Sequence, residues 1–83
     1  TALYNLLIRI FGADEIRRLI GFLPDGQELV AELPGATASL MATASAVVDV
    51  LQRHGRVDDT FWSAVHRARP HRHDEIERVR RGG

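Results

Sequence analysis

Apolar residues recur three and four positions apart along most of the chain, which is typical of helices that bury one face. The first stripe runs from Leu3 to Phe11 and covers most of its helix, so we expect this helix to lie centrally. The apolar positions of the five further stripes are Ile16, Leu19, Ile20 and Leu23; Leu29, Val30 and Leu33; Leu40, Ala44, Val47, Val48 and Leu51; Phe61, Trp62, Val65 and Ala68; and Ile76 and Val79. No run alternates with the period of two that marks a strand, so the pattern predicts about six short helices.

Residues that begin and end helices separate these stripes. We expect Ser39 and Asp58 to be N-caps, and Asp25 with Glu28 three residues later to form a capping box. Gly55 suits a left-handed residue at the end of the longest helix. Further stop signals are Gly12, Pro34 and Pro70. The sequence therefore predicts an all-α fold, a compact bundle in one domain over residues 1–81 with a frayed tail at 82–83.

The composition argues against several classes of protein. The chain has 83 residues, 45% of them hydrophobic, as expected for one small globular domain. It contains no cysteine, which excludes disulfides, thiol nucleophiles and thiolate metal sites and fits a cytoplasmic location. No stretch reaches the roughly 18 apolar residues of a membrane span, so we expect no membrane partner. Because the sequence lacks a starting Met, we expect it to be a domain of a longer protein.

The four histidines are the only conceivable catalytic or metal-binding feature. His71 and His73 stand two positions apart, which directs their side chains roughly 200° apart on a helix rather than toward one ion. Ser39, Ser45 and Ser63 stand in no sequence motif of a nucleophile, and no glycine-rich loop is present to hold a phosphate. We therefore expect no enzyme, no catalytic residue, no metal, no cofactor and no small-molecule substrate.

The charges are balanced, with 11 basic residues, all of them Arg, and 11 acidic residues. Most acidic residues fall in first turns and many basic ones in last turns, where the helix dipole favours them. Two groups are left unexplained: Glu28 with Glu32, which are like charges one turn apart, and Arg67, Arg69 and Arg72, which have no acidic residue three or four positions before them. One acidic and one basic face favour head-to-tail association. The alternative is that both are solvated surface, or that they pair within the monomer.

Several short motifs resemble the bacterial effector-associated domain of the first type. They are Leu3-Tyr4-Asn5-Leu6-Leu7 through Phe11, Ala13-Asp14-Glu15-Ile16-Arg17, Leu23-Pro24, Leu33-Pro34-Gly35, Ala38-Ser39-Leu40, Arg53-His54-Gly55, Val57-Asp58 with Phe61-Trp62, and Arg69-Pro70-His71-Arg72 to Glu75-Ile76. The resemblance spans nearly the whole chain, although each motif consists mostly of caps and core residues. Gly12 departs from the family, in which a Ser or Thr cap would be expected.

The resemblance implies a small helical adaptor similar in fold and role to eukaryotic death-fold domains. Such domains are appended to larger bacterial proteins of conflict and programmed-death systems. Copies on separate proteins pair homotypically, which brings a sensor, often a signal-transducing NTPase, to an effector such as a trypsin-like or caspase-like peptidase. The family has no catalytic residues to transfer.

We therefore predict a non-catalytic adaptor in which Glu28 and Glu32 of one copy contact Arg67, Arg69 and Arg72 of the next. One alternative is a helical nucleic-acid-binding domain, although zero net charge and the lack of Lys make nucleic acid an unlikely partner. Its phosphate contacts would come from Arg56, Arg67, Arg69, Arg72 and Arg78. Another alternative is a regulatory or dimerisation appendage of a parent enzyme that uses exposed apolar residues such as Met41.

Overall fold

The computed structural model describes residues 1–82 and contains six α-helices and one 3-10 helix. The elements are α1 (Ala2–Ile10), α2 (Ala13–Gly21), α3 (Gly26–Ala31), α4 (Leu40–Arg53), α5 (Asp59–Ala68), the 3-10 helix η1 (Pro70–Arg72) and α6 (His73–Arg80). No strand occurs within residues 1–82, so the predicted all-α bundle of about six short helices is confirmed.

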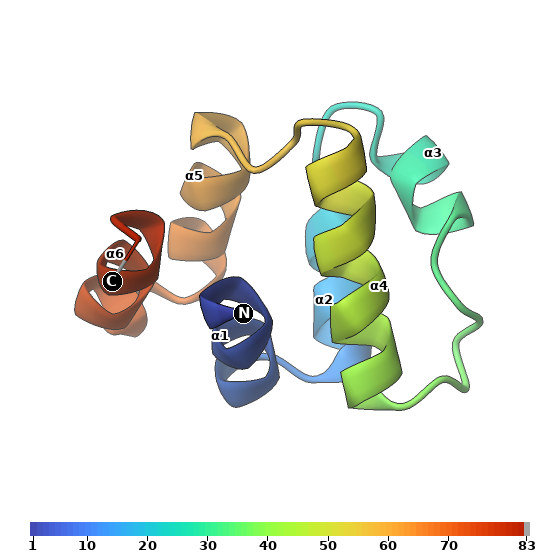
Figure 1. Ribbon diagram of the computed structural model, residues 1–83, viewed down its shortest axis with the longest axis horizontal. Coiled ribbons are helices and arrows are strands. Elements are labelled where there is room, and N and C mark those ends of the chain that lie inside the picture. Colours follow the sequence, from blue (N-terminus) through green and yellow to red (C-terminus); the bar gives the residue numbers. More distant parts are fainter. Residues whose placement is uncertain (83) are drawn as a thin grey trace.

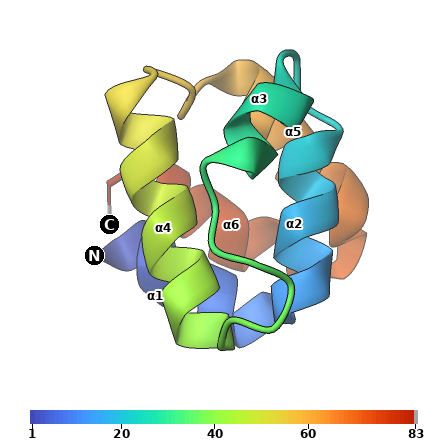
Figure 2. The ribbon, with the colours of Figure 1, turned by 90° about the vertical axis from the view of Figure 1, so that its right-hand side faces the viewer.

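The helices form a bundle in which α2 and α4 lie side by side and α3 stands at the outside (Figures 1 and 2). Helix α1 packs against α4 on one side and α6 on the other, which gives it the central position that its broad apolar surface predicts. Helix α5 contacts α2 and α6. The segment from α3 to α4 crosses the face between α2 and α4, where Arg17 Nη1 of α2 donates to the carbonyl of Pro34 at 2.6 Å (Figure 2).

The predicted stripes supply most of the core. The stripe residues that are buried are Leu3, Leu6, Leu7, Ile10, Phe11, Ile16, Leu19, Ile20, Leu23, Leu29, Ala44, Val47, Val48, Leu51, Phe61, Trp62, Val65 and Ile76. Five predicted positions differ, since Ala68 is exposed at the end of α5 and four others are only half-buried, namely Val30, Leu33, Leu40 and Val79. Thr43 and Val50 are buried although the stripe of α4 omits them, because α4 is covered by both α1 and α2.

Three of the predicted helix boundaries are confirmed by their hydrogen bonds. Ser39 Oγ accepts from the Ala42 N–H at 3.1 Å, and Asp58 Oδ1 accepts from the Phe61 N–H at 3.0 Å. Gly55 has a left-handed φ of 64° after α4. The next N–H, of Arg56, then returns to the Leu51 carbonyl at 2.8 Å, which completes a Schellman motif.

The predicted capping box at α3 is wrong. Asp25 has a left-handed φ of 60°, and its side chain makes no capping hydrogen bond, because the tight turn directs the carboxylate away from the helix. That carboxylate pairs with Arg56, which follows α4. Helix α3 also ends at Ala31, earlier than the stripe predicts. Leu33 lies beyond it in a tighter turn, in which its N–H donates to the Val30 carbonyl at 3.0 Å.

The predicted frayed tail at 82–83 is described only at its first residue. Gly82 is exposed, and its N–H donates to the Val79 carbonyl at 3.0 Å. Gly83 lies outside the described residues.

Candidate protein-interaction site

The two predicted acidic residues have different surroundings. Glu32 follows α3 and contacts the end of α4, where its carboxylate lies 2.7 Å from His54 Nε2 and 3.4 Å from Arg53 Nη2. Its side chain is 34% exposed. Glu28 is exposed on α3 and forms no ion pair with any residue from 1 to 82. Glu32 therefore helps to join α3 to α4, whereas the carboxylate of Glu28 is available to a partner.

The three predicted arginines line two separate grooves. Arg67 and Arg69 line a groove between α2 and α5, and Arg72 lines a second groove between α1 and α6. Arg67 is exposed and has no ion-pair partner in the part of the chain that the structure describes. Arg69 and Arg72 both pair with acidic residues of the same molecule. The three are thus close in sequence but differ in what their charges contact.

Arg69 joins the ends of three helices. Its Nε donates to the Ile10 carbonyl at 2.7 Å, which satisfies an end group of α1, and its Nη2 pairs with Glu15 in the first turn of α2. The guanidinium also lies over the ring of Phe11, with Cζ 4.5 Å from the ring centre. Glu15 in turn accepts from the Gly12 N–H at 2.8 Å. That bond, and then Arg69, lower the pKa of Glu15 below its ordinary range.

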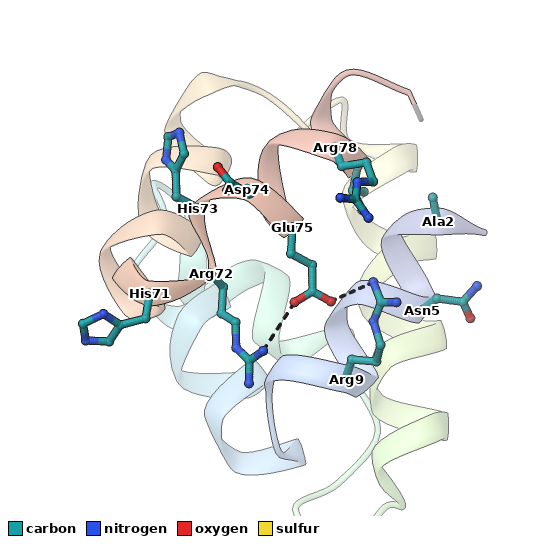
Figure 3. A pocket seen from close by; sticks show the side chains of 10 residues that line it. Ala2, Asn5, Arg9, His71, Arg72, His73, Asp74, Glu75 and Arg78 are labelled. Atoms are coloured by element: carbon teal, nitrogen blue, oxygen red, sulfur yellow. Dashed lines mark ion pairs between the residues drawn. The ribbon is translucent and has the colours of Figure 1, made fainter.

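The α1–α6 groove has its own counterion. Glu75 stands between two arginines, with its carboxylate 2.9 Å from Arg9 Nη2 and 3.7 Å from Arg72 Nη1 (Figure 3). Arg78 reaches toward the same groove from the next turn of α6. Because Glu75 already occupies the position where an incoming anion would bind Arg9 and Arg72, this basic cluster is largely neutralised from within.

The α2–α5 groove combines an apolar floor with a basic rim. Phe11 and Leu19 line it from the α2 side, and Ala64 and Ala68 line it from α5. Phe22, the residue after α2, forms part of the wall, and 85% of its surface is exposed. The remaining lining residues are Glu15, Arg18, Arg67 and Arg69. The groove measures about 420 Å³ and offers an incoming side chain both apolar contact and positive charge.

Phe22 is the most exposed large hydrophobic side chain of the described residues, and the apolar stripes alone do not single it out. Its signal is present in the sequence, since an aromatic residue falls outside the stripe of Ile16, Leu19, Ile20 and Leu23. Because Leu23 takes the buried position at the end of α2, Phe22 is left on the surface.

Two histidines and their partners join α5 to α6. His66 Nε2 lies 2.6 Å from the Glu77 carboxylate, and the rings of His66 and His73 are 4.8 Å apart between centres. Arg80 forms ion pairs with both helices: its Nη2 lies 2.8 Å from Asp59 Oδ1, and its Nη1 lies 3.5 Å from Glu77 Oε2. The hydrogen bond from His66, followed by the nearby Arg80 charge, lowers the pKa of Glu77. This cluster satisfies its own charges and serves to hold the two helices together.

The described residues contain no group of three or more His, Cys, Asp and Glu side chains placed to hold a metal ion. Within the same residues, no helix combines the length and apolar character needed to cross a membrane.

Comparison with known proteins adds no identification. No family model, no curated protein and no solved structure matches this chain. Its function is therefore inferred from the residues of the chain and from the resemblance of its motifs.

Proposed function

We propose that this chain is a non-catalytic adaptor domain that associates with other copies of the same domain type. The observation that carries the proposal is the contrast among the five predicted interaction residues. Glu32, Arg69 and Arg72 have intramolecular partners, whereas Glu28 on α3 and Arg67 on α5 are exposed and unpaired within residues 1–82. One available carboxylate and one available guanidinium on different helices suit contact between copies.

Such a contact joins two different surfaces, so each copy keeps one of each for the next. This heterologous arrangement produces rings when the rotation closes and open filaments when it does not. The resemblance to effector-associated domains gives the association its role, which is to bring a peptidase effector to a sensor NTPase during bacterial conflict or programmed-death signalling. The cytoplasm is the proposed location.

The charge pairs favour a protein partner over nucleic acid. Of the five arginines that would contact phosphates, Arg56, Arg69 and Arg72 form ion pairs with Asp25, Glu15 and Glu75. A nucleic-acid surface needs a concentration of uncompensated positive charge, and these pairs remove much of it.

Light scattering behind size exclusion, over a wide range of protein concentration and salt, tests self-association. We expect the mass to rise with protein concentration and to fall with added salt, because the proposed contact joins exposed charges that salt screens within about 10 Å at 0.1 M. A mass equal to one chain, 9.3 kDa, under all conditions would contradict self-association.

A further inference from the structure

The groove between α2 and α5 has the properties of a receiving surface. A phenylalanine that is 85% exposed keeps a large apolar ring in water, and exposed aromatic side chains beside a pocket are common centres of protein contacts. Phe22 stands at one wall of the groove, next to a floor formed by Leu19, Ala64 and Ala68. Burial of this ring against a partner would remove apolar surface from water without any change in the fold.

The charges around the groove indicate the chemistry of its occupant. Arg18 and Arg67 line it, and neither forms an ion pair within the part of the chain that the structure describes. The Glu15 carboxylate, which also lines the groove, is already held by Arg69 and by the Gly12 N–H. An occupant that brings a carboxylate together with small or apolar side chains would match both the rim and the floor.

The third helix of a second copy matches this description. It stands at the outside of the bundle (Figure 1). It carries the unpaired Glu28, and Ala31, which is also exposed, lies three residues later on the same side of the helix. A small residue there lets the α3 backbone approach Phe22 closely. A two-fold contact of groove with groove would instead oppose Arg18 and Arg67 to the same residues of the other copy, which like charge disfavours.

We infer that the α2–α5 groove receives α3 of a second copy, with Phe22 as the apolar centre and Glu28 facing Arg18 and Arg67. This inference depends on the proposed homotypic function and names the two surfaces that meet. It also separates the roles of the predicted arginines, since Arg67 takes part in the contact while Arg69 supports the groove wall from within.

Single-cysteine variants test the pairing of surfaces, because the chain contains no cysteine of its own. Ala31→Cys marks α3 and Ala68→Cys marks the groove, and both positions are exposed. Under mild oxidation, we expect a mixture of these two variants to form the mixed disulfide dimer at least tenfold faster than either variant alone. Ser45→Cys, exposed on α4, mixed with Ala31→Cys is the matched control and should show only the slow background rate.

A second pair of variants tests Phe22 without cysteines. Phe22→Ser should weaken association at least tenfold, whereas Met41→Ser, which alters another exposed apolar residue, should leave it unchanged.

Disulfide formation by Ala68→Cys alone at the rate of the mixture would show a two-fold contact and overturn the choice of α3. If the wild-type chain associates but the mixture cross-links no faster than the control, the inference fails while the adaptor function stands. A wild-type chain that is monomeric at all protein and salt concentrations would contradict both this inference and the proposed self-association.

Discussion

Replacement of Gly26 by Ala is expected to destabilise the domain by about 3 kcal/mol, because the added methyl group has no space. A Cβ at this position would lie 2.5 Å from the carbonyl oxygens of both Ile20 and Gly21. These are backbone atoms of α2, so they cannot move aside as the end of a flexible side chain would. Helix α3 would have to separate from α2, and the burial of Leu29 would be lost with it.

Thermal unfolding followed by circular dichroism measures this effect. For a domain of this size we expect the Tm of Gly26→Ala to fall by roughly 12–24 °C. Gly21→Ala is the matched control, because a Cβ there meets only Val30 Cγ2 at 4.0 Å, an ordinary contact. That substitution should be neutral or should stabilise by up to about 1 kcal/mol, since Ala is the better helix former. Equal stability of Gly26→Ala and the wild type would contradict the close packing of α3 on α2.

Replacement of Arg69 by Ala is expected to lower the free energy of unfolding by about 2–3 kcal/mol. The Ile10 carbonyl would lose its hydrogen bond from a charged donor, and such a bond contributes about 1.5–3 kcal/mol. The contact with the Phe11 ring would add about 0.5–1 kcal/mol. The exposed ion pair between Arg69 and Glu15 adds little to this energy, because surface ion pairs contribute little to stability.

The control for Arg69→Ala lies two residues earlier, on α5. Arg67→Ala removes an exposed arginine that has no ion pair within residues 1–82, so its free energy of unfolding should stay within about 0.5 kcal/mol of the wild type. Urea denaturation at low protein concentration, where association does not contribute, compares the two variants. Similar losses for both would show that Arg69 does not join the helix ends as described.

The helices were predictable because their signals are local. Stripes of apolar residues require only the neighbours three and four positions away, and Ser39, Asp58 and Gly55 act through hydrogen bonds that span at most five residues. The capping box predicted at Asp25 is wrong for a related reason, because its rule also considers only neighbouring residues. The spacing to Glu28 satisfies the rule for a capping box, but the left-handed turn and the pairing with Arg56, 31 residues later, depend on how α2, α3 and α4 meet.

The candidate site was less predictable, since charge pairs across the bundle decide which residues remain available. Arg69 and Glu15 are 54 residues apart in sequence, and Glu32 and His54 are 22 apart. No rule based on spacing connects such positions. Five charged residues are therefore equivalent at the level of sequence, and only the fold distinguishes Glu28 and Arg67 from the other three. Phe22 shows the same limit, because its groove exists only where α5 lies beside α2.

Contact between Glu28 of one copy and the surface around Arg67 of the next can be tested with a charge-swap mixture. Glu28→Arg and Arg67→Glu should each abolish association when alone, because like charges would then face each other. In an equimolar mixture, the arginine introduced on α3 of one variant faces the glutamate introduced on α5 of the other. The second kind of junction in the mixture keeps its wild-type pair.

Light scattering at low salt measures the mass of each variant and of the mixture, and circular dichroism verifies that the variants are folded. We expect one-chain masses for each variant alone and recovery of the wild-type mass in the mixture. Wild-type association of either variant alone, or a mixture of folded variants that stays monomeric while the wild type assembles, would show that Glu28 does not face Arg67 of the next copy.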